Sequence, residues 1–233
     1  EVEELVKGSF LEHSPVVEVS AMTGAGLDDL RAEIVRQAQA TGERPSRGAA
    51  RLPIDRAFSM KGFGTVVTGT LVSGALEEGG AYALLPKGRV VRVRGLQSHG
   101  EARPRVEAGR RIAVNLGGVD VADVHRGDTL ASPGAFSIAR RFDAVIENDS
   151  PRAIRNGARV RVYQGTSESL GRVTLGPEYS SRLNKPGSET DTPNRVYSTG
   201  KNVPDLPVPE LLPGHRAFAR VRLETPAVLT RGD

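Results

Sequence analysis

The sequence predicts a mainly β fold made of two small antiparallel β-barrels, preceded by a short α/β segment. Its 233 residues include 27 glycines, 15 prolines and no tryptophan, and such frequent turn residues are typical of many short strands. From about residue 50 onward, short apolar runs alternate with turns rich in Gly, Pro and Asp. This alternation is the pattern of small closed barrels.

The first 50 residues predict the α/β segment. Residues 2–6 have the apolar spacing of a helix, and residues 16–21 (VVEVSA) form a short strand of the buried type. Residues 27–40 form a second helix, whose apolar stripe would pack on a sheet. The stretch 41–50 (TGERPSRGAA) has the composition of an exposed connector, so we place the first domain in residues 1–47.

The first barrel is expected in residues 48–135, built around a hairpin in residues 51–70 (RLPIDRAFSMKGFGTVVTGT). Gly62 and Gly64 permit the turn between its two strands. Asp55 and Arg56 are neighbours in the first strand, where a regular pleat directs them to opposite faces, so at least one of them needs a partner or a ligand. The other strands of this barrel are expected at 82–85, 90–96, 111–116 and 128–131.

The second barrel is expected in residues 136–233. Its predicted strands lie at 139–145, 159–162, 170–175 and 216–223. Residues 176–210 are rich in Pro, Ser, Asn and charge and have almost no periodicity, which predicts a long flexible loop. The basic and tyrosine residues of this loop also fit an insertion that contacts RNA, but solvated disorder is the simpler interpretation.

Charge and composition limit the classes of function. Residues 1–50 contain 5 basic and 9 acidic side chains, a net charge of −4, so the remainder of this +4 chain carries +8. A basic body fits contact with a polyanion, and it fits a solvated basic surface equally well. The chain has no cysteine and no apolar run of 18 residues, so we expect a soluble cytoplasmic protein without disulfides or a membrane span. His99 and His125 are not spaced with other ligands, which favours surface histidines over a metal site.

Three runs carry a resemblance to a known family. They are PIDRAFSMKGFGTVVTGTLVSGALEEGG (53–80), KGRVVRVRGLQSHG (87–100) and VEAGRRIAVNLGGVDVADVHRGDTLASPG (106–134). Together they resemble the second domain of translational elongation factors, and within that superfamily the selenocysteine-specific elongation factors. VYQGTSESLGRVTL (162–175) and AFARVRLETPAV (217–228) are similar to strand pairs of the third domain. The resemblance implies two barrels, the second incomplete because the family continues into another strand.

The resemblance also implies a nucleotide-binding remnant near the beginning of the chain. VSAMTG (19–24), followed by Gly26 and Leu27, resembles the last nucleotide-binding motif of the family's GTPase domain, in which the main-chain N–H groups of Ser20, Ala21 and Met22 would lie beside the guanine base. A small-residue turn before a helix is the alternative. The sequence has neither G-x-x-x-x-G-K-[ST] nor N-K-x-D, so we expect no catalytic residue and no hydrolysis in this chain; GTP with Mg²⁺ belongs to the intact family.

A second implied site binds the aminoacyl end of tRNA. Asp55, Arg56 and Arg111 stand at the positions that surround the amino acid in the resembled family. A selenol is ionised at neutral pH whereas serine is neutral, so two guanidinium groups could distinguish them while Asp55 binds the α-amino group. The alternative is that these arginines pair locally with Asp55 or Glu107. A further expectation is a basic rim for the acceptor stem or 3′ end of the tRNA, formed by Lys61, Lys87, Arg89, Arg92 and Arg94.

The resemblance implies selenocysteinyl-tRNA and the ribosome as partners of a monomer. It implies contact with the selenocysteine-insertion mRNA hairpin only through carboxyl-terminal winged-helix repeats that this sequence does not contain. Two alternatives stay open. One is a general elongation or initiation factor, and the other is a nucleotide-independent RNA-binding module of two barrels.

Overall fold

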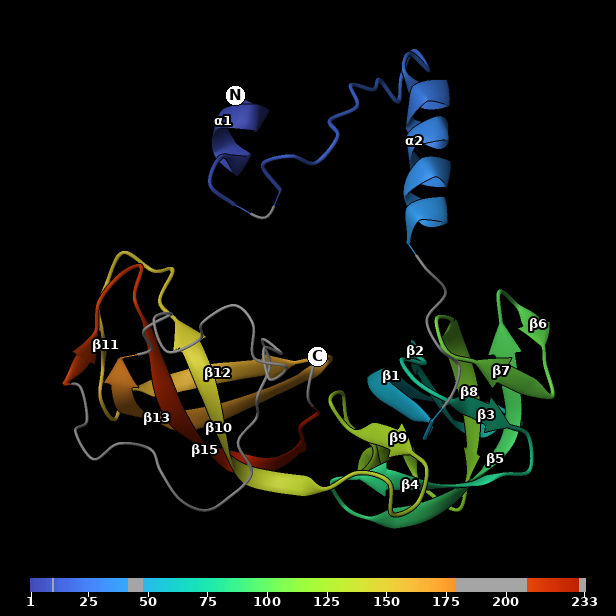
Figure 1. The fold of residues 1–233 in the computed structure, drawn as a ribbon. Coiled ribbons are helices and arrows are strands. Elements are labelled where there is room, and N and C mark those ends of the chain that lie inside the picture. The colour runs from blue at the N-terminus through green and yellow to red at the C-terminus, as the bar shows by residue number, and fades with distance from the viewer. Residues whose placement is uncertain (10, 42–47, 179–208, 231–233) are drawn as a thin grey trace. The chain divides into compact units, whose positions relative to one another are not determined.

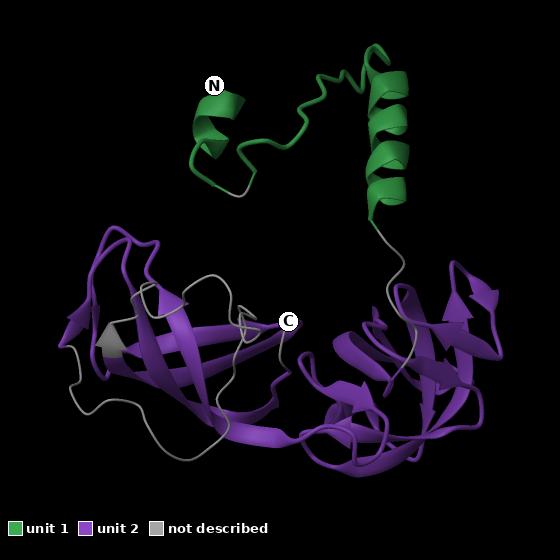
Figure 2. Ribbon diagram, in the orientation of Figure 1, with its two compact units in different colours: residues 1–44 green, residues 45–233 purple. Residues whose placement is uncertain are grey.

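The computed structural model describes residues 1–9, 11–41, 48–178 and 209–230. The chain divides into two compact units, residues 1–44 and 45–233 (Figure 2). The first unit contains the helices and the second contains the strands (Figure 1). No helix among the described residues is long and apolar enough to cross a membrane.

The first unit contains α1 (Val2–Val6) and α2 (Leu27–Ala40), as the apolar spacing predicts. The strand predicted at 16–21 is wrong: these residues are not in a strand, and Val16 and Val19 are exposed. A β-strand needs a hydrogen-bonded neighbour, and no strand is present in residues 1–9 or 11–41 to supply one. The apolar stripe of α2 likewise packs on no sheet, because none of its residues is buried.

Six antiparallel strands close the predicted barrel in the second unit. Each strand pairs with the next, and β4 pairs with both β9 and β5, which completes the circle (Figure 1). In spatial order they are β1 (Arg51–Met60), β2 (Gly64–Thr70), β8 (Arg111–Gly117), β5 (Arg89–Ser98), β4 (Ala81–Leu85) and β9 (Thr129–Ala131). All six lie at the predicted positions. β6 (Glu101–Ala102) pairs with the end of β5 and so extends the sheet at that point.

Besides β6, three short elements at the barrel were not predicted. β3 (Ala75–Glu77) pairs with β7 (Arg105–Glu107) in a separate two-stranded sheet. The 3₁₀ turn η1 (Val121–Asp123) lies between β8 and β9. These pieces are only two or three residues long, so they carry no detectable periodicity in the sequence.

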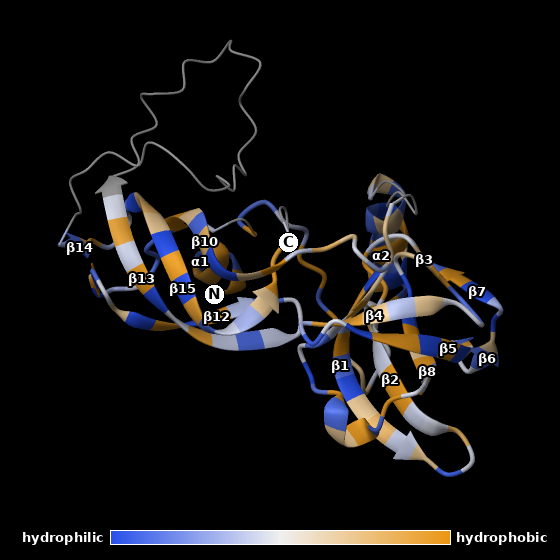
Figure 3. Cartoon of the chain, turned by 90° about the horizontal axis from the view of Figure 1, so that it is seen from below, coloured by the Kyte–Doolittle hydropathy of each residue, from blue (hydrophilic) through white to orange (hydrophobic). Residues whose placement is uncertain are grey.

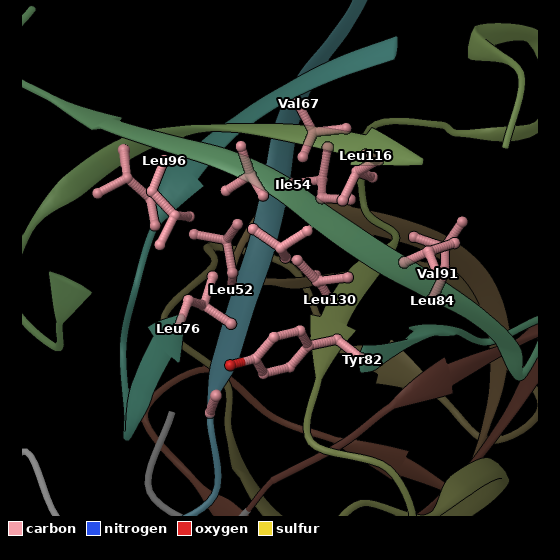
Figure 4. Close-up of a cluster of buried hydrophobic side chains, with 14 of the residues drawn as sticks. Leu52, Ile54, Val67, Leu76, Tyr82, Leu84, Val91, Leu96, Leu116 and Leu130 are labelled. Atoms are coloured by element: carbon pink, nitrogen blue, oxygen red, sulfur yellow. The ribbon is translucent and has the colours of Figure 1, made fainter. Parts of the chain in front are cut away.

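The barrel interior is filled by aliphatic side chains. Leu52, Ile54 and Leu130 are completely buried and point into one cluster (Figure 4). Tyr82 lies at the border of this cluster, where its hydroxyl accepts a hydrogen bond from the Glu77 main-chain N–H at 3.0 Å. Since a buried hydroxyl without a partner is costly, this contact explains how a tyrosine is accommodated in an otherwise aliphatic core.

The remaining strands form a four-stranded antiparallel sheet with its own core. The order is β10 (Ile138–Glu147), β15 (Arg216–Val228), β13 (Ser167–Glu178) and β12 (Arg159–Gln164). Hydrophobic and hydrophilic bands alternate along β13 and β15 (Figure 3), as expected for a sheet with one buried face. β11 (Ile154–Arg155) and β14 (Glu210–Leu211) form a separate pair.

The described residues do not show whether the predicted second barrel closes. Within the described residues, β10 and β12 are the two edges of the four-stranded sheet and do not pair with each other. The loop predicted at 176–210 is shorter at both ends, because β13 continues to Glu178 and β14 starts at Glu210. The rest of that predicted loop, residues 179–208, lies outside the described residues.

Candidate functional site

Asp55 lies at an irregularity in the ladder between β1 and β2. Ile54 is opposite Gly69 and Arg56 is opposite Thr68, so Asp55 is the extra residue of a β-bulge. Directly opposite residues share a face of the sheet, which puts Arg56 on the face of Thr68. Asp55 is on that face too, because it accepts a 2.7 Å hydrogen bond from the Thr68 hydroxyl. The expectation that Asp55 and Arg56 point to opposite faces is therefore wrong, since the bulge interrupts the alternation.

Arg111 joins this face from the neighbouring strand. It is opposite Thr70 on β2, two residues along the strand from Thr68. Its Nη2 donates to Asp55 Oδ1 at 3.0 Å, and its Nη1 donates to Asp55 Oδ2. The pair is therefore bidentate, the geometry in which guanidinium and carboxylate match best. The Asp55 side chain is only 18% exposed, whereas that of Arg111 is 54% exposed and stays open to a ligand.

The surroundings of Asp55 keep it charged. Burial raises the pKa of its carboxyl, but the hydrogen bonds from Arg111 and Thr68 and the positive charges of Arg111 and Arg56 outweigh burial, so the pKa lies below its usual value. The site at neutral pH is thus one carboxylate with two guanidinium groups beside it.

Arg56 and Arg111 differ in how many of their N–H donors remain available to a ligand. Arg56 is exposed and forms no ion pair with any residue of the described part of the chain. Arg111 is paired with Asp55, as the sequence-based alternative anticipated, but a guanidinium has five N–H donors and Asp55 occupies two of them. A carboxylate next to partly free guanidinium donors is complementary to a ligand that carries an ammonium group and an anion close together.

Thr68 is the residue of this site that sequence reasoning missed. Its hydroxyl donates to Asp55 and lies 3.5 Å from Arg111 Nη2. The run VVTGT predicts only a strand, and no local signal in the sequence marks this threonine. Its role follows from the register of β2 against β1 and β8, which a single sequence does not specify.

The second predicted site lies in the first unit, in the turn before α2. The Ser20 main-chain N–H donates to the Ala25 carbonyl at 3.0 Å, and the Ser20 hydroxyl accepts from the Thr23 N–H at 3.2 Å. Within the described residues, the N–H groups of Ala21 and Met22 make no hydrogen bond, and the Met22 side chain is 98% exposed. Two of the three predicted main-chain donors are thus unoccupied, and that of Ser20 is used within the turn.

No metal-binding group emerges from the described residues, where no three His, Asp or Glu side chains converge. His99 occupies a turn with a φ of 54°. His125 lies 3.9 Å from Asp128, to which its main-chain N–H donates.

Comparisons with known proteins agree with this architecture. Residues 64–131 match the family of elongation factor Tu domain 2. The chain is 41% identical over 175 residues to a selenocysteine-specific elongation factor of Desulfomicrobium baculatum, an alignment that covers 74% of this chain and 28% of that protein.

Two solved structures are similar in fold. The crystal structure of a bacterial selenocysteine-specific elongation factor is 27% identical with a TM-score of 0.72, covering 100% of this chain and 33% of that one. The elongation factor SelB of Methanococcus maripaludis, solved with the GTP analogue GppNHp, has a TM-score of 0.74 at 22% identity, covering 100% of this chain and 48% of that one; this second likeness shows the fold alone.

A six-stranded barrel that matches elongation factor Tu domain 2 defines the chain as part of a translational elongation factor. Its particular family is that of the selenocysteine-specific elongation factors, to which the chain belongs. The chain spans little more than a quarter of the length of the curated relatives in this family, at 28%.

Proposed function

We propose that the whole protein binds GTP with Mg²⁺ and delivers selenocysteinyl-tRNA to the ribosome, and that Asp55, Arg56 and Arg111 bind the esterified amino acid. The names of the relatives support the activity, and the solved complex with a GTP analogue supports the nucleotide. We also propose that Ser20, Ala21 and Met22 lie beside the guanine base. The proposed domains are a remnant of the GTPase domain in residues 1–47, the first barrel in 48–135 and the second barrel in 136–233. We further propose that the protein acts as a cytoplasmic monomer.

One observation carries the proposed amino-acid site. The bulge at Asp55 brings to one face of the barrel a charged carboxylate, a bidentate Arg111 and an Arg56 that has no ion-pair partner among the described residues. Asp55 would accept hydrogen bonds from the α-ammonium group, and the two guanidinium groups would attract the selenolate. Serine has no charge at this position, so the attraction to Arg56 and Arg111 would be lost for seryl-tRNA.

The test of this function compares two aminoacyl-tRNAs on the same tRNA body. We expect the whole protein, loaded with GTP, to bind selenocysteinyl-tRNA at least about tenfold more tightly than seryl-tRNA, since one charge-assisted contact contributes that much. Fluorescence titration of labelled tRNA measures both dissociation constants. Equal affinities would favour a general elongation factor or an RNA-binding module instead.

The role of Asp55 has a separate test, because it concerns the amino group rather than the side chain. N-acetylation of the aminoacyl-tRNA removes the α-ammonium charge. We expect it to weaken binding about tenfold in the natural protein and to have little effect in the Asp55→Asn variant. If acetylation weakens binding equally in both proteins, Asp55 does not bind the amino group.

A further inference from the structure

The barrel has a pocket of about 430 Å³ that none of the site residues lines. Its walls come from the β1–β2 hairpin, from β5, from the end of β8 and from residues 118–122. Thr65 on β2 lines it and is opposite Leu116, whereas Arg111 is opposite Thr70. Thr65 also lies three residues of strand from Thr68, which donates a hydrogen bond to Asp55, so the pocket and the Asp55 site are about 10 Å apart along β2 at 3.4 Å per residue.

Arg94 is directed toward this pocket by a second β-bulge. Val93 is opposite Leu116 and Gly95 is opposite Asn115, so Arg94 is the extra residue of β5. Its guanidinium lies over Gly117, where an added Cβ would be 2.5 Å from Arg94 Nε. A side chain at position 117 would thus displace the guanidinium. Bulges often re-aim a side chain next to a functional site.

Arg94, the cation on this wall, has no ion-pair partner among the described residues. By contrast, Arg89, which also lines the pocket, donates to Asp123 Oδ2 at 3.0 Å. The Ser59 hydroxyl, a further lining group, makes no hydrogen bond among the described residues. Unused donors are thus grouped around a hollow that is large enough for a small ligand.

The loop that forms the opposite wall is held in place. The Thr65 hydroxyl donates to the Val119 carbonyl at 2.8 Å, and Arg89 Nη2 donates to the Gly118 carbonyl at 2.6 Å. Lys87 Nζ donates to the Asp123 carbonyl at 2.6 Å. Lys87 and Arg89, expected from the sequence to form part of a basic rim, therefore fasten the loop. A loop fixed in this way loses little entropy when a ligand binds.

We propose that this pocket binds a phosphate group, held by Arg94 with Arg89 and Ser59 as additional donors. A guanidinium presents paired N–H donors that match phosphate oxygens. The volume beyond the arginines accommodates the group to which the phosphate is esterified. The exposed Asp120 carboxylate also lines the pocket, so a phosphate close to it is opposed by charge.

The experiment titrates the 233-residue chain with inorganic phosphate and, separately, with a short single-stranded RNA. The readout is the NMR shift of the Arg94 Nε–Hε signal together with the dissociation constant from calorimetry. Arg94→Gln should weaken binding at least about tenfold, the effect of losing a charged hydrogen-bond donor. Arg92→Gln removes the same charge from the same strand but does not line the pocket, so it should change the constant less than about twofold.

Two further variants test the geometry with the arginine still present. Gly117→Ala places a Cβ against Arg94 Nε and should weaken phosphate binding as strongly as Arg94→Gln does. Asp120→Asn removes the opposing charge and should tighten binding roughly twofold. The Asp120 side chain makes no capping hydrogen bond to η1, so this variant should fold normally, which a thermal melt verifies.

The two ligands identify the source of the phosphate. Arg94-dependent binding of inorganic phosphate supports a free phosphate compound, and Arg94-dependent binding of the RNA alone supports a nucleic-acid backbone. The proposal is overturned if neither ligand depends on Arg94, or if Arg92→Gln weakens binding as much as Arg94→Gln does. Because the pocket shares no residue with the Asp55 site, either result leaves the proposed aminoacyl site unaffected.

Discussion

At the scale of single residues, the Asp55 carboxylate is the group on which the proposed aminoacyl site depends. It accepts hydrogen bonds from Arg111 and Thr68, and its pKa is lowered in the folded chain. A carboxyl group with an unfolded-state pKa of about 3.9 and a lower folded-state pKa stabilises the fold above pH 3.9. This contribution is lost as the pH falls through the folded-state pKa.

We therefore expect Asp55→Asn to lower the free energy of unfolding by about 1 kcal/mol at pH 7, the size of a charge-assisted contact that is partly exposed. The difference from the natural chain should shrink as the pH falls below about 3.9. Urea denaturation at a series of pH values measures it, with Asp120→Asn as the control. A difference that is constant from pH 7 to acid would show that the charge of Asp55 does not stabilise the fold.

Thr68 gives a second prediction, because its hydroxyl is one of the groups that lower the pKa of Asp55. Thr68→Val keeps the shape of the side chain and removes the donor, so the pKa of Asp55 should rise. An NMR titration of the Asp55 carboxyl carbon checks this. Thr70→Val, two residues along the same strand and exposed, should leave that pKa unchanged. An unchanged pKa in Thr68→Val would refute the positioning role of Thr68.

At the scale of elements, the sequence predicted all six barrel strands but not the bulges that shape the two sites. Alternating apolar residues and glycine-containing turns mark strands locally. A bulge, by contrast, depends on how two strands pair. The bulge at Asp55 exists because Ile54 is opposite Gly69 while Arg56 is opposite the next residue, Thr68. For that reason the sequence points to Asp55 and Arg56 as candidate site residues but does not predict their common face or the hydrogen bond from Thr68.

Two glycines next to these bulges provide an element-scale test. A Cβ at Gly69 would be 2.2 Å from the Pro53 carbonyl oxygen, whereas a Cβ at Gly95 would meet no atom within 4 Å. Neither glycine has a positive φ, so alanine is compatible with both backbones. Gly69→Ala should destabilise the chain by about 1–3 kcal/mol and Gly95→Ala by less than about 0.5 kcal/mol. Thermal unfolding followed by circular dichroism compares them, and equal losses would contradict the close approach at Gly69.

At the scale of the whole molecule, stability is concentrated in the strands. The barrel and the four-stranded sheet each have a buried cluster, whereas α2 has no buried residue. Helix positions 27–40 were predicted correctly because their spacing is local. The prediction of a strand at 16–21 is wrong because a strand needs a hydrogen-bonded neighbouring strand, and the described residues 1–9 and 11–41 contain none.

This contrast predicts the pattern of amide hydrogen exchange. Amides of α2 should exchange at least about 100-fold faster than those of β2, which is paired on both sides by β1 and β8, because elements with little buried surface open locally. Hydrogen–deuterium exchange of the 233-residue chain, followed by mass spectrometry, measures the exchange rates of α2 and β2 in one experiment. Comparable protection of α2 and β2 would mean that α2 is stabilised by packing that the described residues do not show.

The central claim is that one face of the barrel recognises an anionic amino-acid side chain. Its most direct test is the ratio of the dissociation constants of seryl-tRNA and selenocysteinyl-tRNA for the GTP-loaded whole protein and for its Arg56→Gln variant, with Arg92→Gln as the control of equal charge. The account predicts a ratio of at least about ten in the natural protein and in Arg92→Gln, and a ratio smaller by roughly threefold or more in Arg56→Gln, in which only Arg111 still attracts the selenolate. A ratio that Arg56→Gln leaves unchanged would contradict it.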